Sequence, residues 1–269
     1  PAVKGVKNII AVASGKGGVG KSTTTVNLAL AMAKLGAKVG ILDADIYGPS
    51  IPLMLGANDV RPEQYDENTM RAIQVHGLAV NSIGFIALDD QAMIWRGPMA
   101  SRALLQILTE THWGELDYLF VDMPPGTGDI QLTLSQNIPV TGAVIVSTPQ
   151  DVALADAAKG ITMFRKVSVP VLGIVENMST HICSNCGHEE AIFGTGGVVK
   201  MAQRFNSECL AQLPLHIDLC ADIDAGKPTV VSQPNSNFSA IYSDLASKTA
   251  AKLFFETNTI STEIPIKLT

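Results

Sequence analysis

Short apolar runs alternate with longer helical patterns along most of the chain. The apolar runs have the length of strands and lie at residues 8–13, 38–42, 78–85, 118–122, 143–147 and 169–175. Alanine- and leucine-rich patterns with helical spacing lie between and after them, at residues 22–34, 100–110, 130–136, 153–166 and 238–255. Strands that are apolar at nearly every position are typical of a parallel sheet covered on both faces. The pattern therefore predicts an α/β fold, a mainly parallel β-sheet with helices on both faces.

No linker-like segment and no internal repeat divides the chain, so we expect a single domain over residues 1–255. The polar stretch 58–70 departs from the alternation and is expected to be an exposed loop. Residues 256–269 have no clear period and are expected to form a loosely held tail.

Composition narrows the class of protein. Hydrophobic residues make up 46% of the chain, enough for a sizeable core, and the net charge of −6 argues against a broadly basic nucleic-acid surface. No apolar run approaches the roughly 18 to 20 residues of a membrane-spanning helix. Four cysteines are too few for a disulfide scaffold in a chain of this size. We therefore expect a cytoplasmic protein with neither a membrane nor a nucleic acid as partner.

The strongest chemical signal is a complete P-loop motif between the first strand and the first helix. It consists of Gly15, Lys16, Gly17, Gly18, Val19, Gly20, Lys21 and Ser22. Glycines let backbone N–H groups point into a concave loop that holds phosphates, and the following helix N-terminus favours negative charge. In such a site Lys21 reaches the outer phosphates and the Ser22 hydroxyl ligates Mg²⁺. The alternative is a glycine-rich turn that binds nothing.

Carboxylates follow two of the predicted strands, at the edge where α/β sheets bind ligands. Asp43 and Asp45 follow strand 38–42, and Asp122 ends strand 118–122. We expect Asp122 to contact Mg²⁺ through water, whereas Asp129 could instead cap the helix that begins at residue 130. The chain has no GTPase-type Asn-Lys-x-Asp sequence, which favours ATP as the nucleotide.

A C-x-x-C motif, Cys183 to Cys186, follows the strand at 169–175. A tetrahedral sulfur site takes about four ligands, and this motif supplies two. A second chain could supply the other two. Alternatively, Cys209 and Cys220 could complete the site within one chain, His181 and His188 could complete a zinc site, or the motif could be a redox pair. For Cys209 and Cys220 a place in the core is the better interpretation.

The P-loop resembles the deviant motif of the MinD, ParA and nitrogenase iron-protein class of P-loop NTPases, because Lys16 lies inside it. That resemblance implies a homodimer that holds two ATP molecules between its chains, with Lys16 reaching the partner's nucleotide. It also implies that Thr23 joins the nucleotide-binding residues and that Asp43 and Asp45 form switch I. Asp45 would then orient the attacking water, Gly126 would bind the γ-phosphate through its N–H, and Asn177 would read adenine. A simple turn residue is the alternative for Asn177.

Together, DADIYGPS (43–50), WRGPM (95–99), DMPPGTGDIQLTL (122–134), ENMS (176–179) and the C-x-x-C motif resemble the Mrp/ApbC iron–sulfur carrier group over roughly residues 6–255. The resemblance implies a slow, Mg²⁺-dependent ATPase that carries a labile [4Fe–4S] cluster. Cys183 and Cys186 of two chains would hold the cluster, which would pass to apo iron–sulfur proteins. Members often carry a small domain before this one, and the start at Pro1 without Met indicates that such a domain is missing here. The alternative function is a MinD- or ParA-like positioning ATPase with a structural zinc site.

Overall fold

The computed structural model describes residues 3–86 and 97–258. Over these ranges nine strands form one sheet in the order β10-β9-β8-β1-β7-β2-β5-β4, with β11 also paired to β9. They are β1 (Val6–Ala13), β2 (Val39–Asp43), β4 (Ile73–Val75), β5 (Leu78–Ser82), β7 (Leu116–Asp122), β8 (Gly142–Ser147), β9 (Val171–Ile182), β10 (Glu189–Glu190) and β11 (Cys209–Leu215). Two short strands, β3 (Met70–Arg71) and β6 (Thr111–His112), pair separately.

The sheet is mainly parallel, as the sequence predicts. All pairs from β11 through β9, β8, β1, β7 and β2 to β5 are parallel. Within the described part of the chain, antiparallel pairs of this sheet occur at its two ends, where β10 meets β9 and β4 meets β5. The carboxyl ends of the parallel strands therefore share one edge, and the loops that follow them gather there.

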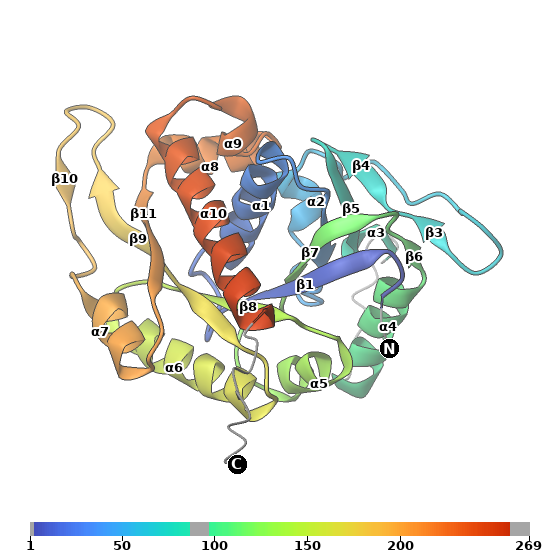
Figure 1. The fold of residues 1–269 in the computed structure, drawn as a ribbon. Helices are drawn as coiled ribbons and strands as arrows, with labels where there is room; N and C mark the ends of the chain where they lie inside the picture. The colour runs from blue at the N-terminus through green and yellow to red at the C-terminus, as the bar shows by residue number, and fades with distance from the viewer. Residues whose placement is uncertain (1–2, 87–96, 259–269) are drawn as a thin grey trace, which may run out of the picture.

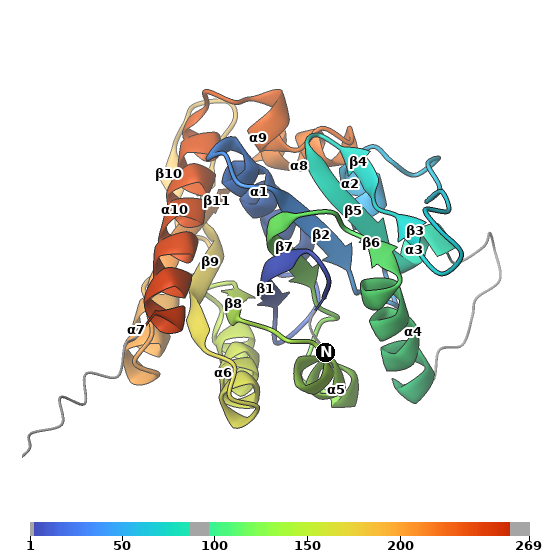
Figure 2. The ribbon, with the colours of Figure 1, turned by 45° about the vertical axis from the view of Figure 1, so that its right-hand side comes forward.

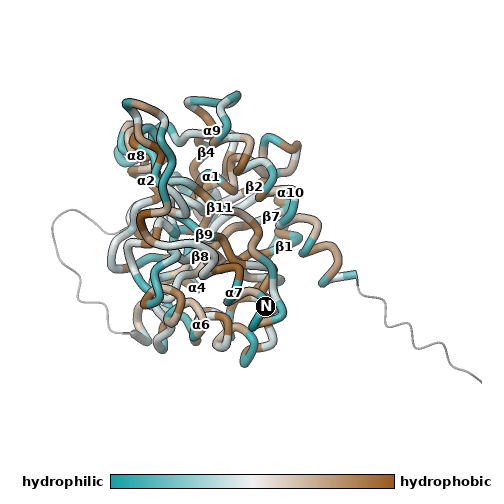
Figure 3. Tube along the Cα trace, turned by 90° about the vertical axis from the view of Figure 1, so that its left-hand side faces the viewer, coloured by the Kyte–Doolittle hydropathy of each residue, from teal (hydrophilic) through white to brown (hydrophobic). Residues whose placement is uncertain are grey.

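Helices cover both faces of the sheet (Figure 1 and Figure 2). They are α1 (Lys21–Lys34), α2 (Ile51–Met54), α3 (Ile83–Ile86), α4 (Gly97–Thr109), α5 (Asp129–Asn137), α6 (Asp151–Lys166), α7 (Gly197–Arg204), α8 (Ile217–Asp224), α9 (Thr229–Ser232) and α10 (Asn237–Thr257). On β1, Ile9 and Ala11 pack into a core with α4, α5, α6 and α7, while Ile10 and Val12 pack into a second core with α1 and α10. Alternate residues of one strand thus fill two apolar layers. In Figure 3 much of the hydrophilic colour lies on peripheral loops and helix surfaces.

Two strand ends and one long strand differ from the prediction, which also did not include the short elements α2, α3, α7, α8, α9, β3, β4, β6 and β10. The strand expected at 78–85 ends at Ser82, whose hydroxyl accepts a hydrogen bond from the Gly84 N–H (2.9 Å) and turns the chain into α3. The strand expected to end at residue 175 continues to Ile182, because β11 pairs with its second half up to Leu215 opposite His181. The pattern did not predict β11 itself.

Smaller differences concern the termini and the loops. The last helix continues to Thr257, two residues into the range expected for the tail. The stretch 58–70 is largely irregular and exposed, as expected, although Met70 begins β3. Residues 87–96, which include Trp95 and Arg96 of the WRGPM motif, and residues 259–269 of the tail lie outside the described residues. No helix in the described ranges is long and apolar enough to cross a membrane.

Candidate nucleotide and thiol site

The P-loop lies at the carboxyl edge of the sheet, between the end of β1 and the start of α1. Gly18 and Gly20 have φ angles of +78° and +80°, which side chains other than glycine rarely adopt. A Cβ atom on Gly17 or Gly18 would meet no heavy atom within 4 Å, so the outer side of the loop is open to a ligand. A Cβ on Gly15 would collide with the backbone of Asp156 in α6. The loop is therefore open on one side and rests on α6 on the other.

Asp122 accepts hydrogen bonds from the polar side chains in the first turns of α1. Its Oδ2 accepts hydrogen bonds from the Lys21 ammonium (2.6 Å) and the Ser22 hydroxyl (2.6 Å), and its Oδ1 accepts one from the Thr25 hydroxyl (2.7 Å). Asp122 and Thr25 are fully buried, and Lys21 is 6% exposed. Sequence reasoning missed Thr25, although its position one helical turn after Lys21 places both on the same face of α1.

Two further carboxylates, those of Asp43 and Asp45, lie in the same cluster as Lys21 and Asp122. Asp43 accepts hydrogen bonds from the Ser82 hydroxyl (3.0 Å) and the Ile51 N–H (3.1 Å), and Asp45 lies 3.9 Å from the Lys21 ammonium. Burial, and then repulsion from Asp122, raise the pKa of Asp43 to about 7. Burial also raises the pKa of Asp45, against the opposing effect of Lys21. Sequence reasoning did not foresee Ser82, which reaches this site from the neighbouring strand.

This cluster fits a divalent cation. Asp45 and Asp122 share the Lys21 ammonium, at 3.9 Å and 2.6 Å. The buried carboxyl of Asp43 accepts a hydrogen bond from the Asp45 N–H (3.2 Å) and forms no ion pair with any described residue, so the site has room for further positive charge. No group of three or more His, Cys, Asp or Glu residues in the described ranges has the geometry of a protein-only metal site. Mg²⁺ fits this donor set, because it usually binds through one or two protein oxygens, several waters and the substrate's phosphates.

Lys16 lies within the P-loop, and Gly126 lies in the loop that follows β7. Lys16 is half-buried, and its ammonium forms no ion pair or hydrogen bond with any residue that the structure describes. Gly126 has a φ of +99°, and its N–H donates to the carbonyl oxygen of Ser14 at 2.9 Å. The amide of Gln131, a residue that sequence reasoning missed, holds the turn before Gly126 by donating to the carbonyls of Pro124 (3.1 Å) and Pro125. The loop after β7 is therefore folded back onto the P-loop.

Asn177 lies inside β9, so its interpretation as a turn residue is wrong. Its side-chain amide donates to the carbonyl of Val19 at 2.9 Å. A Cβ on Gly20 would collide with this amide, which gives a second reason for glycine there besides its positive φ. Thr23, half-buried in the first turn of α1, accepts a hydrogen bond at its carbonyl from Asn27 (3.1 Å). The structure thus brings together the P-loop, Asn177 and the three carboxylates.

The C-x-x-C motif lies at the tip of a hairpin that extends from the same edge (Figure 1). The last pair between β8 and β9 is Ser147 with Glu176, and β9 continues for six residues beyond it. At about 3.3 Å per residue, the hairpin projects at most roughly 20 Å past this pair. The left-handed backbone of Met178 (φ +55°) and the register shift against β11 bend the strand there and shorten this span. Its turn is closed by the Cys183 N–H, which donates to His188 (2.9 Å), and by the Gly187 N–H, which donates to Cys183 (2.8 Å).

The two thiols of this motif differ. Cys183 is half-buried and Cys186 is exposed. The backbone N–H groups of Cys186 and Asn185 point at the Cys183 sulfur and lower the pKa of this thiol. This lowered pKa favours the thiolate of Cys183, the form that binds metals.

The other cysteines do not complete this site within one chain. Cys209 lies at the start of β11, paired with Ile174, and its thiol donates to the carbonyl of Ala211 (3.5 Å). It is half-buried, whereas Cys220 is exposed on α8, so the expectation that Cys220 belongs to the core is wrong. Because no cluster of three potential ligands occurs among the described residues, the completions through Cys209 and Cys220 or through the two histidines are not formed. One chain therefore provides two thiols, those of Cys183 and Cys186, to this site.

Comparison with known proteins agrees with this geometry. The family model of the NUBPL iron-transfer P-loop NTPases, within the ParA group, matches residues 5–250. The iron-sulfur cluster carrier proteins of Salmonella typhimurium and Escherichia coli are each 66% identical over 267 residues, which cover 99% of this chain and 72% of each relative. The iron-sulfur cluster transfer protein NUBPL of Mus musculus is 51% identical over 253 residues, 93% of this chain and 79% of the relative.

Solved structures place the fold in the same group. A nucleotide-binding protein of Archaeoglobus fulgidus, solved in complex with ADP, is 39% identical with a TM-score of 0.76, over 88% of this chain and 92% of that one. The cell division ATPase MinD of Pyrococcus furiosus has a TM-score of 0.68 at 22% identity, over 91% and 98% of the two chains. At 22% identity, the likeness to MinD supports the fold alone. By its sequence and its fold, this chain belongs to the NUBPL iron-transfer P-loop NTPase family.

Proposed function

We propose that the protein is a Mg²⁺-dependent ATPase that carries a labile [4Fe–4S] cluster between two chains and transfers it to apo iron–sulfur proteins. The observation that carries the proposal is the hairpin, which holds two thiols at the edge of the nucleotide site and leaves half of a four-ligand site to be supplied from outside. The names of the relatives favour this function over a positioning ATPase of the MinD or ParA kind.

The nucleotide roles follow from the positions of the residues. The open P-loop and Lys21 bind the phosphates, and Asn177, beside Val19, contacts the adenine. Asp45, close to Lys21, orients the attacking water, and the Gly126 N–H turns from Ser14 to the γ-phosphate. Mg²⁺, held by Ser22 and by Asp43 and Asp122 through water, would neutralise the charge that develops on the phosphates. Since Lys16 has no partner among the described residues, it is free to reach the nucleotide of a second chain.

The same edge has the character of an interface between two copies. Exposed apolar side chains follow the ends of β2, β8 and β11: Tyr47 is 68% exposed, Val152 68% and Ile217 63%. Exposed apolar side chains that gather on one face are typical of protein contacts. In a two-fold dimer each hairpin meets its symmetry mate, so Cys183 and Cys186 of both chains provide four thiolates. The free thiols suit a reducing compartment such as the cytoplasm.

The test of the cluster site is anaerobic reconstitution, with iron, sulfide and zinc counted per chain and the oligomer mass measured in the same sample. We expect about two irons per chain in a dimer, and their loss in Cys183→Ala and in Cys186→Ala. Cys220→Ala is the matched control, since it removes an exposed thiol elsewhere and should keep the iron. Tightly bound zinc without sulfide, or metal on a monomer, would refute the carrier function.

The nucleotide site is tested separately by ATP turnover. Lys16→Ala should retain much of the nucleotide binding while hydrolysis falls, because the group acts on the partner's nucleotide. Loss of binding with an unchanged rate per bound nucleotide would refute a role across the interface.

A further inference from the structure

A cavity of about 500 Å³ lies outside the nucleotide site, where the loop after Gly126 meets α5, α6 and α7. In Figure 1 these three helices lie along the lower side of the molecule. The proposed carrier function gives this cavity no role. The loop provides Thr127 to Asp129 as one wall, and α6 provides another, with Lys159, Met163 and Lys166.

The rim of this cavity is positively charged in a chain whose net charge is −6. Lys159 forms an ion pair with Asp156 (2.8 Å), so its charge is balanced. Lys166 and Arg204 have no carboxylate partner among the residues that the structure describes, and Arg204 only lies over the Phe205 ring at 5.6 Å. Asp129 is the acidic residue of the lining. Two exposed cations therefore line the same cavity, and neither has a carboxylate partner among the described residues.

The floor of the cavity is apolar. Leu132 and Phe205 are partly buried against the core, and Met163 is 8% exposed. Cations above an apolar floor fit a ligand that carries both carboxylates and a large apolar side chain. An acidic peptide segment has this chemistry, whereas a free inorganic anion would leave the floor uncovered.

The cavity is in contact with the nucleotide site at two places. Thr127 follows Gly126, whose N–H is bonded to Ser14 of the P-loop at 2.9 Å. On the other side, Gly15 rests on the backbone of Asp156 in α6, less than one turn before Lys159. If a phosphate takes the N–H of Gly126, the bond to Ser14 breaks and the wall that begins at Thr127 must move.

We propose that this cavity docks an acidic segment of a protein partner and that the bound nucleotide sets its affinity. The segment places two carboxylates on Lys166 and Arg204 and one large apolar side chain on the floor formed by Leu132, Met163 and Phe205. The docking rests on the cavity alone, whereas its control by nucleotide rests on the proposed ATP site.

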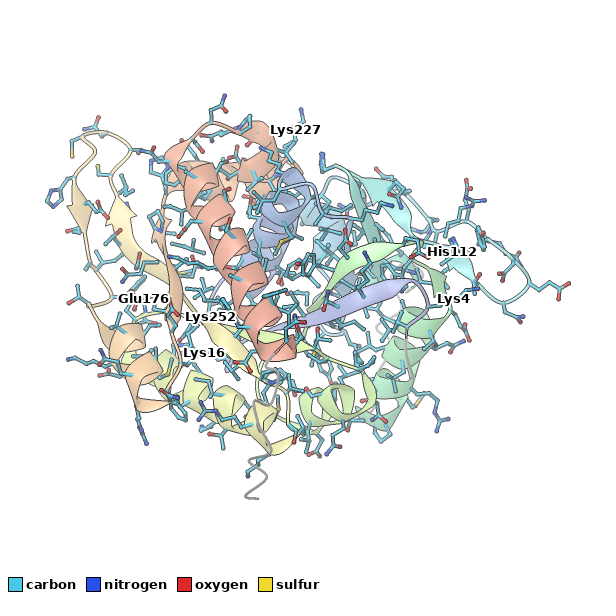
Figure 4. The ribbon with its side chains drawn as sticks, in the orientation of Figure 1. Lys4, Lys16, His112, Glu176, Lys227 and Lys252 are labelled. Carbon is cyan, nitrogen blue, oxygen red and sulfur yellow. The ribbon has the colours of Figure 1, made fainter. Side chains whose placement is uncertain are left out.

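The test uses fluorescence anisotropy of a short fluorescein-labelled peptide made of Glu, Gly and Ser with one central Phe, against the full chain. A twin peptide with Gln in place of each Glu is the ligand control. The test variant is Lys166→Glu with Arg204→Glu. The protein control is Lys4→Glu with Lys227→Glu, which changes the net charge equally at two exposed lysines away from α6 and α7 (Figure 4).

We expect the test variant to weaken the Kd at least about tenfold, because two attractions become repulsions, and the control variant to change it less than about twofold. Binding should also weaken as NaCl is raised. Equal weakening by both variants, or equal binding of the Gln twin, would overturn the docking site. The proposed peptide site would also be overturned if vesicles of anionic phospholipid bound through Lys166 and Arg204 while the peptide did not.

The effect of the bound nucleotide on docking is measured with ADP and with a non-hydrolysable ATP analogue. Nucleotide loading is followed with a fluorescent nucleotide. A Kd that differs several-fold between the two loaded states is expected, and the same Kd in both would overturn the control by nucleotide. If neither nucleotide loads, the proposed ATP site fails, and the comparison of variants without nucleotide still decides the docking.

Discussion

Thr25 gives the sharpest quantitative test of the buried site. Its hydroxyl donates to Asp122 at 2.7 Å, and both residues are fully buried. Thr25→Val keeps the shape of the side chain and removes the donor, so one carboxylate oxygen loses its partner away from water. A hydrogen bond to a charged group is worth about 1.5–3 kcal/mol, which is the expected loss in the free energy of unfolding. For a chain of this size, that loss lowers Tm by roughly 3 to 10 °C.

The measurement is urea unfolding followed by circular dichroism, without nucleotide and at one pH. Thr25→Ser is the matched control, because it keeps the hydroxyl and loses one methyl group, at a cost of about 1 kcal/mol. A Thr25→Val midpoint as high as that of the wild type, with an unchanged m-value, would refute the assignment of this bond as a main support of Asp122.

Three further predictions follow from the same site. Lys21→Ala should abolish ATP turnover, measured as phosphate release, because it removes the ammonium that Asp122 holds at the end of the P-loop; undiminished turnover would exclude the phosphate role. Since the pKa of Asp43 is raised to about 7, the folded chain holds a proton that the unfolded chain releases near pH 4, so stability should fall from about pH 4 to pH 7. Its slope should reach at most about 1.4 kcal/mol per pH unit, and urea midpoints of Asp43→Asn across this range should be flatter. Gly20→Ala should lower Tm, and adding Asn177→Ala should restore part of the loss, because it removes the collision and leaves the strain at φ +80°.

The parts of the site that short sequence motifs determine could be predicted. The P-loop is one continuous motif, and Asp43 and Asp122 each lie at the end of a predicted strand, so a parallel sheet brings them to one edge. This holds although Lys21 and Ser22 are 101 and 100 residues from Asp122 in the sequence. Thr25 and Ser82 were missed for different reasons. Thr25 lies three residues after the P-loop motif, where the motif assigns no role, whereas Ser82 reaches Asp43 only through the pairing of β2 with β5.

The second half of β9 could not be predicted, because its stability is not local. Residues 177–182 are largely polar and do not resemble a buried strand, yet they pair with β11, for example Asn177 with Leu213. The strand β11 could not be predicted either, because it contains Pro214, and proline within a run argues against a central strand. A proline is tolerated there because β11, which pairs with β9 alone among the described strands, leaves its other side free of ladder bonds.

The length of β9 has a mechanical consequence. Six residues separate Asn177, bonded to the P-loop, from Cys183 in the turn that holds the two thiols, a span of at most about 20 Å. The left-handed backbone of Met178 (φ +55°) and the register shift against β11 place an irregularity at the nucleotide end of this span, where the strand can bend. A tilt of about 10° at the nucleotide end would displace the thiols by roughly 3 Å. That displacement exceeds the length of a metal–thiolate bond, about 2.3 Å. In the carrier that we propose, a small rearrangement around a phosphate would therefore be large enough, at the other end of the strand, to separate sulfur from a bound metal.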